Sequence, residues 1–211
     1  MSKEFPEGFL WGTAVSSFQV EMGRGKPSDK TDWWAWVNDK DNIDEGIVSG
    51  RTPLDGPGFW ELYKEDFKLL KEKLGNNSIR VSVDWGRFFP DPIDDIQVPV
   101  TLDDEGLVSC VEMTEQHLTE MDKRANQSAV KRYREIFTEA KKQDITLMLT
   151  LFHWPIPLWL HDPIKCKKDM KNATKRGWLD NKTVIEFTKF SAYIAYKYGD
   201  VVDLYCTINE P

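Results

Sequence analysis

The 211-residue sequence predicts an α/β fold built on a parallel β-sheet. Stretches of strand character alternate with stretches in which apolar residues recur at helical spacing, in the order strand, helix, strand, helix, strand, helix, strand. Polar or charged residues follow each predicted strand directly. Such alternation is typical of parallel sheets with right-handed crossover connections. Doubly wound sheets and (β/α)8 barrels both begin in this way, and periodicity does not distinguish them.

The first predicted elements are a strand, a helix and a second strand. Residues 9–20 are mostly apolar and are expected to form a buried strand, followed by a long loop to residue 32. Residues 79–83 are β-branched and bounded by turn residues, which favours a strand. Between them, helical spacing predicts a helix that stops at Gly75. Its apolar residues are Phe59, Tyr63, Phe67, Leu70 and Leu74.

The remaining elements follow a segment of different composition. Residues 90–125 are rich in Pro, Asp and Glu, and we expect them to form an insertion outside the barrel core of a single partial domain spanning 1–211. Residues 145–152 form a nearly continuous apolar run, which suits a strand covered on both faces. Residues 201–208 are the fourth predicted strand. The two helices that precede these strands are marked by Val130, Tyr133, Phe137 and Ala140, and by Val184, Phe187, Ser191, Ile194 and Tyr198.

Composition argues against several classes of protein. The net charge of -7, with both signs interspersed, shows no basic face for nucleic acid. No uncharged apolar run approaches the roughly 18 residues of a membrane span, and no signal peptide is visible, so we expect a cytoplasmic protein. The three cysteines lack CxxC spacing, and neither a metal nor a cofactor is expected. Nine Trp residues hint at carbohydrate, because sugar rings stack on flat aromatic surfaces.

Polar side chains at the strand ends are the candidate functional residues. In either α/β architecture, functional groups lie beyond the carboxyl ends of the strands. These side chains could therefore converge on one mouth. They are Gln19 and Glu21, Asp84 and Arg87, His153, and Asn209 with Glu210, while Arg80 lies inside its strand and needs a carboxylate or carbonyl partner.

Five motifs in order resemble glycoside hydrolase family 1. They are Phe-Leu-Trp-Gly-Thr-Ala at 9–14, Phe-Gln-Val-Glu at 18–21, Arg-Val-Ser-Val-Asp-Trp-Gly-Arg at 80–87, His-Trp-Pro at 153–155 and Asn-Glu-Pro at 209–211. Residues 32–37 and 48–50 are similar to the archaeal β-glycosidase branch of that family. The resemblance covers nearly the whole chain.

The resemblance implies a (β/α)8 barrel, of which this chain supplies about the first four strands, and retaining hydrolysis of β-linked oligosaccharides or aryl and alkyl β-glycosides. By the same resemblance, Glu210 matches the general acid/base and Asn209 the residue that hydrogen-bonds the sugar 2-hydroxyl. Gln19, His153 and Trp154 match glycone-binding positions, and Arg80 matches the arginine that contacts the nucleophile. Trp33 is expected near the sugar site.

Two departures from the family pattern bear on activity. Gly86 stands where the family more usually has Ala or Ser, which leaves the interpretation intact. The family's nucleophile motif, (Thr/Ile)-Glu-Asn-Gly, is absent from these residues. We therefore expect a part of a longer hydrolase that is inactive alone and is completed by a C-terminal half. The alternative is a non-catalytic half-barrel that binds sugars or assembles with a partner, including a homo-oligomer.

Simpler interpretations remain for each residue taken singly. A lone Glu210 would be a surface glutamate, since carboxylates are mostly exposed. His153 and Trp154 could be a satisfied core pair, and Arg80 a structural ion-pair member. The tryptophans near residue 34 are more often packing than binding residues. A doubly wound nucleotide-binding domain is disfavoured, because no GxGxxG or GxxxxGK[ST] motif follows the first strand.

Overall fold

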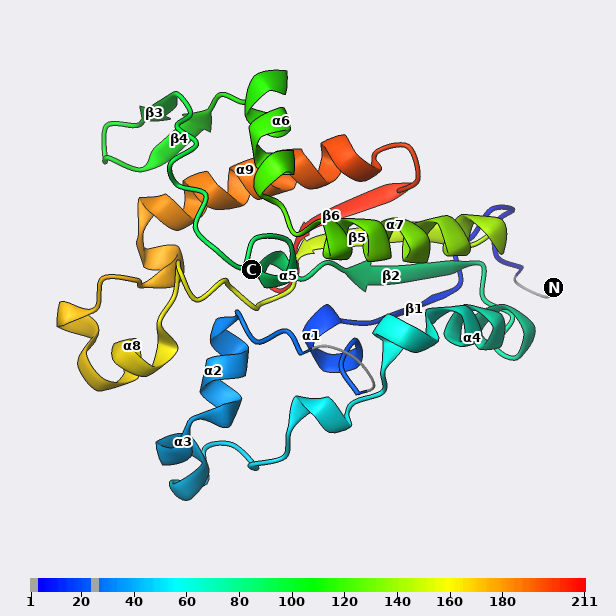
Figure 1. Cartoon of the computed structure of the whole chain (residues 1–211). Coiled ribbons are helices and arrows are strands. Elements are labelled where there is room, and N and C mark those ends of the chain that lie inside the picture. The colour runs from blue at the N-terminus through cyan, green and yellow to red at the C-terminus, as the bar shows by residue number, and fades with distance from the viewer. Residues whose placement is uncertain (1–3, 24–26) are drawn as a thin grey trace.

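A computed structural model describes residues 4–23 and 27–211. Its main sheet has four parallel strands, shown in Figure 1, in the order β1, β2, β5, β6. These strands are Gly12–Ala14, Ser78–Ser82, Thr146–Phe152 and Leu204–Ile208. Each strand of this sheet pairs with the strand of the same sheet that precedes it in the chain, so the order never reverses. A doubly wound sheet would reverse at a switch point, whereas a barrel adds its strands in one direction.

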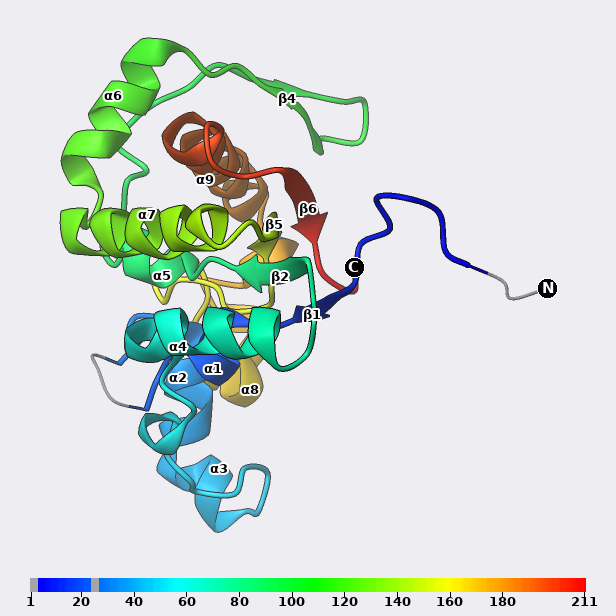
Figure 2. The ribbon, with the colours of Figure 1, turned by 90° about the vertical axis from the view of Figure 1, so that its right-hand side faces the viewer.

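Three long helices connect the four strands. They are α4 (Phe59–Glu72), α7 (Gln127–Lys142) and α9 (Asn181–Tyr198), and each was predicted from its apolar spacing. Figure 2 shows all three on the same side of the strands. Helices on one side and strands added in one direction are the arrangement of a (β/α)8 barrel wall. The predicted fold class, with about four strands of such a barrel, is confirmed.

The hydrophobic core lies between the sheet and these helices. Alternate residues of β2 and β5, such as Val81 and Leu149, are buried against aromatic side chains of the helices. The residues between them face the other side, where Arg80 pairs in register with Met148 and both are only half-buried. Both faces of the strand expected at 145–152 are covered at its end, where residues 149–152 are all buried, whereas Thr146 and Met148 at its start are only half-buried. Within the described chain the helices cover only one face.

The predicted first strand is shorter and more exposed than expected. Only Gly12–Ala14 is a strand, and all three residues are exposed, because β1 is an edge of the sheet. Residues Ser17–Val20 form the short helix α1 instead. Gly12 permits the close pairing of β1 with β2, since a Cβ atom there would lie 2.6 Å from the Ser78 carbonyl oxygen.

The segment between β2 and α7 has regular structure of its own. A two-stranded antiparallel sheet, β3 (Val100–Leu102) and β4 (Val108–Val111), leads into α6 (Glu115–Arg124), whose first turn is closed by a capping box at Thr114. Ile93, Ile96 and Met121 of this segment are nevertheless buried in the core cluster. The segment thus contributes apolar side chains to the core while its hairpin projects outward.

Short elements complete the fold. Among the described residues, no helix combines the length and apolar character needed to cross a membrane. The short helices are α2 (Asp32–Asn38), α3 (Lys40–Asp44), α5 (Trp85–Phe88) and α8 (Pro163–Asp169), with 3-10 turns at Pro53–Asp55, Met170–Asn172 and Gly177–Leu179.

Candidate active site

The structure divides the strand-end residues into two groups. His153, Trp154, Asn209 and Glu210 directly follow β5 and β6, and they interact with one another and with Arg80, which lies inside β2. Glu21, Asp84 and Arg87 belong to a separate, buried cluster. The strand ends therefore do not converge on one mouth as the sequence suggested.

Arg80 orients the amide of Asn209. Its Nη2 donates to Asn209 Oδ1 at 2.9 Å, and the two residues are 129 positions apart in the chain. A guanidinium can only donate, so the amide oxygen must face Arg80, and the amide NH2 is left as a donor. The required partner of Arg80 is thus an amide oxygen within the described chain. Asn209 itself is buried.

His153 is a buried imidazole with an unused nitrogen. Burial lowers the pKa of His153 below its usual 6.5, and the positive charge of Arg80 acts in the same direction, while the carboxylate of Glu210 opposes both. The ring is therefore neutral at neutral pH, with one donor and one acceptor nitrogen. Among the described residues, His153 Nδ1 has no hydrogen-bond partner. An unsatisfied buried group costs roughly 1–3 kcal/mol, so it is suited to bind a ligand hydroxyl.

Trp154 and Trp33 form a stacked aromatic pair. Their ring centroids are 5.3 Å apart with an angle of 18° between the planes, and Phe18 meets Trp33 edge-on. Trp154 has φ = 82°, in the left-handed region that bulky residues rarely adopt. Strain of this kind is often found at functional sites. We call this pair the tryptophan wall.

Gln19 and Glu210 are both exposed. Gln19 lies in α1, which follows β1, and Glu210 directly follows Asn209 after β6. Glu210 also has a left-handed backbone, with φ = 49°. Its carboxylate is close enough to His153 to affect the charge state of the imidazole. A carboxyl, an amide, an imidazole and a guanidinium thus surround the ends of three strands.

The second cluster is buried behind the strand ends. Glu21 accepts from Arg87 Nε at 2.8 Å and from the Tyr133 hydroxyl at 2.7 Å, and the Asp84 N–H donates to the same hydroxyl oxygen at 2.8 Å. Ser28 donates to the Asp84 carboxylate. Burial raises the pKa of Glu21 to about 7 and also raises the pKa of Asp84, although Arg87 opposes both shifts. Sequence periodicity identified Tyr133 only as a helix core residue.

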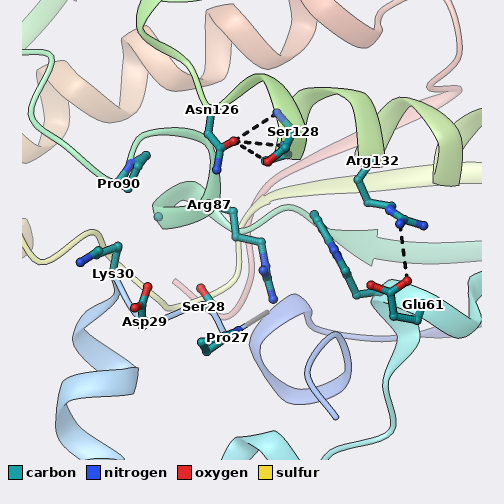
Figure 3. A pocket seen from close by; sticks show the side chains of 13 residues that line it. Pro27, Ser28, Asp29, Lys30, Glu61, Arg87, Pro90, Asn126, Ser128 and Arg132 are labelled. Carbon is teal, nitrogen blue, oxygen red and sulfur yellow. Dashed lines mark hydrogen bonds and ion pairs between the residues drawn. The ribbon is translucent and has the colours of Figure 1, made fainter. Parts of the chain in front are cut away.

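A cavity of about 500 Å³ adjoins this second cluster, between α4, α5 and the start of α7 (Figure 3). Three cationic side chains line it, but Arg132 pairs with Glu61 and Arg87 pairs with Glu21. Asn126 Oδ1 caps the first turn of α7 there. Because both arginines and Asn126 Oδ1 already have partners, the cavity is a weaker candidate than the group around Glu210.

No group of three or more metal-ligating side chains occurs in residues 4–23 and 27–211. All three cysteines are free thiols.

Comparisons with known proteins agree with the motifs. The profile of glycosyl hydrolase family 1 matches residues 1–98 and 120–211. The chain is 42% identical to the β-galactosidase of Pyrococcus woesei, over 98% of this chain and 41% of that relative. The β-glycosidase of Thermosphaera aggregans superposes with a TM-score of 0.96 at 41% identity, covering 99% of this chain and 44% of that chain. The chain spans about two fifths of the length of the curated relatives it matches.

A further solved relative is a β-glucosidase mutant described as derived from a hyperthermophilic tetrameric structure. It superposes with a TM-score of 0.94 at 45% identity, covering 99% of this chain and 44% of that chain. The segment that the family profile leaves unmatched, residues 99–119, contains the β3–β4 hairpin and the first turn of α6.

Proposed function

Since the chain belongs to glycosyl hydrolase family 1, we propose that it supplies the part of a retaining β-glycosidase active site that carries the general acid/base, Glu210. One observation carries the proposal. Asn209 and Glu210 follow β6 at the same end of the sheet as His153, and Arg80 reaches that end to hold the Asn209 amide. Active sites of (β/α)8 enzymes lie at this end of the strands.

Each side chain has a role that its position supports. Glu210 would protonate the departing glycosidic oxygen and then accept a proton from the attacking water. Its exposed position leaves the carboxyl free to reach a bound substrate. The Asn209 amide NH2 and the His153 Nδ1 would bind sugar hydroxyls, with Gln19 contributing from α1. Trp154 would pack against the sugar ring.

Retaining chemistry requires a second carboxylate about 5 to 5.5 Å from the first, acting as the nucleophile. The 211 residues contain no (Thr/Ile)-Glu-Asn-Gly motif. We propose that this carboxylate comes from another segment of protein and lies against Arg80, whose charge would hold it ionised. The substrates would be β-galactosides and β-glucosides, as the names of the relatives suggest.

The location and assembly of the protein are also proposals. The three free thiols support a cytoplasmic location, because disulfides are rare there. A relative derived from a tetrameric structure supports a homo-oligomer. Two copies of this chain would still lack the nucleophile, because each copy brings the same residues.

The test is complementation. The 211-residue chain is mixed with a separately expressed segment of the Thermosphaera aggregans β-glycosidase that begins after its matching region, and hydrolysis of aryl β-galactosides and β-glucosides is measured. We expect activity from the mixture and none from this chain alone. Glu210→Gln should abolish activity of the mixture, whereas Glu112→Gln, on an exposed residue, should not.

A second variant tests the role of Glu210 directly. With Glu210→Ala, added azide should restore turnover and give a β-glycosyl azide, because azide attacks the glycosyl-enzyme without needing a base. Activity of the mixture that survives Glu210→Gln would contradict the proposal. A mixture that binds glycosides but never hydrolyses them would favour the non-catalytic half-barrel.

A further inference from the structure

We propose that Asp32 and His161 form a positioning pair that holds the tryptophan wall, Trp33 and Trp154, at the correct angle for a sugar ring. The sugar part of this inference rests on the proposed function. The positioning part rests only on the structure. Neither Asp32 nor His161 belongs to the residues assigned above to the chemistry or to substrate binding.

Asp32 is buried and its carboxylate is fully engaged. His161 Nδ1 lies 2.7 Å from Oδ2, with the ring nitrogen donating to the carboxylate. The other oxygen, Oδ1, accepts from the N–H groups of Trp33 at 2.7 Å and Ile156 at 2.8 Å. Hydrogen bonds to an ionised acceptor are roughly twice as strong as neutral ones. One carboxylate therefore joins three separate points of the chain.

The residues that hydrogen-bond the Asp32 carboxylate are Trp33 itself and two residues of the loop that contains Trp154. Trp33 is the next residue after Asp32, and Ile156 is two residues after Trp154. Backbone bonds continue the same junction, since Asp32 N–H donates to the Ile156 carbonyl and Leu158 N–H donates to the Lys30 carbonyl, both at 2.9 Å. The junction fixes the α2 segment against the loop after β5. The pairing of residues 30–32 with residues 156–158 sets the position of one indole relative to the other.

Phe18 and His153 each meet one indole of the wall edge-on, but cavities leave the wall only partly enclosed. A cavity of about 600 Å³ adjoins Trp33 and another of about 350 Å³ adjoins Trp154, and both Asp32 and His161 line each of them. The left-handed backbone at Trp154 needs a compensating restraint, because strained residues persist only where the surroundings hold them. The hydrogen bonds of Asp32 supply that restraint.

Gly177 makes room for the His161 ring. A Cβ atom at Gly177 would lie 3.3 Å from His161 Cγ, and its φ of +60° favours glycine. His161 also forms an antiparallel bridge with Arg176. The backbone pairing with Arg176 and the space left by Gly177 therefore orient the imidazole towards Asp32.

The test uses circular dichroism of the unliganded 211-residue chain. Two stacked indoles couple electronically and give a paired positive and negative band in the far ultraviolet. Trp33→Phe and Trp154→Phe identify the part of the spectrum that belongs to the wall, because each removes one member. We expect His161→Leu, which loses the donor, to lose most of this couplet, and His161→Gln, which keeps an N–H donor, to retain it.

His117→Leu is the matched control, because His117 caps α6 and is not part of the Asp32 junction. Each variant is compared at a temperature where its helical signal equals that of the unmodified chain, so that a loss of stability is not mistaken for a loss of stacking. If His161→Leu lacks the helical signal, His161→Ala is measured with and without imidazole. Imidazole should then restore the couplet through the adjoining cavities.

A couplet unchanged in His161→Leu, or lost equally in His161→Gln, would overturn the positioning role. So would a failure of imidazole to restore it in His161→Ala. In the complemented enzyme, His161→Leu should raise KM more than it lowers kcat, because the wall binds the sugar without reacting with it. Absence of hydrolysis by the unmodified mixture would contradict the proposed function while leaving the dichroism result intact.

Discussion

Glu21 lies in the protein interior between the Arg87 guanidinium and the Tyr133 hydroxyl. Burial raises its pKa from 4.5 to about 7. Between those pH values the folded chain keeps a proton that the unfolded chain has lost, so folding is favoured at low pH. This contribution, roughly 3 kcal/mol by the size of the shift, disappears as the pH rises from 4.5 to about 7.

We therefore expect Glu21→Gln to change how stability depends on pH. Relative to this variant, the unmodified chain should lose unfolding free energy as the pH rises from about 5 to about 8. Urea unfolding at both pH values measures the difference. Glu105→Gln, in the exposed β3–β4 turn, is the control. Parallel pH profiles for Glu21→Gln and the unmodified chain would show that Glu21 is ionised throughout.

Lys189 is a buried cation that ties the segment after β2 to α9. Its Nζ donates to the carbonyls of Ile93 and Ile96 and to the Glu186 carboxylate, each at 2.9 Å. Lys189→Met should cost about 3 to 5 kcal/mol, because it leaves a buried carboxylate without its partner. Lys182→Met removes only a part-exposed pair with Asp94 and should cost about 1 kcal/mol or less. Equal losses in chemical denaturation would contradict the argument.

At the scale of elements, α7 depends on its first turn. Asn126 Oδ1 accepts from the N–H groups of Ser128 and Ala129. Asn126→Ala should lower the unfolding free energy by about 1 kcal/mol, since two helix-end donors lose their acceptor. Lys131→Ala, on the exposed face of the same helix, should change it by less than about half that amount. Thermal unfolding followed by circular dichroism distinguishes the two.

The elements that the sequence predicted are those with a long, regular pattern. The three connecting helices present apolar residues at helical spacing over many turns, and β2 and β5 present β-branched or apolar runs. α2, which begins where the expected loop ends, was not predicted, although Thr31 accepts from Trp34 N–H as its N-cap. The β3–β4 hairpin was missed because its strands are short and mostly exposed. Without a buried face, its sequence shows no alternation of apolar and polar residues.

The candidate site was predictable only in part. The motifs pointed to Asn209, Glu210, His153 and Arg80, and the predicted strand boundaries placed the first three directly after strands. The separate cluster around Glu21 and the contact between Asp32 and His161 were not predictable. Both depend on side chains that are far apart in sequence, 129 positions for the latter pair. Local pattern carries no information about such contacts.

At the scale of the whole molecule, β1 and β6 are the open edges of the main sheet. β6 exposes Leu204 and Tyr205, and the N-terminal segment, which extends away from the sheet in Figure 2, exposes Phe5 and Trp11. Unpaired strand edges beside exposed apolar side chains favour association between chains.

We expect the isolated chain to self-associate, and Tyr205→Lys to weaken this association, because a charge on an edge strand opposes pairing. Tyr196→Lys is the matched control, since Tyr196 is 50% exposed but lies on α9. Sedimentation velocity over a concentration series measures both. Equal behaviour of the two variants would place the contact elsewhere.

The strand order also bears on how this protein is made. Each new strand adds to the edge left by the strand before it, so no early strand must wait for a late one to be inserted beside it. During synthesis, β1 and β2 can pair while β5 is still inside the ribosome, and β6 can follow once α9 has emerged. Asn209 and Glu210 follow β6, so they leave the ribosome after the residues of β1, β2 and β5. Trp33 and Trp154 therefore leave the ribosome before the proposed acid/base Glu210, so translation makes the residues of the wall available first.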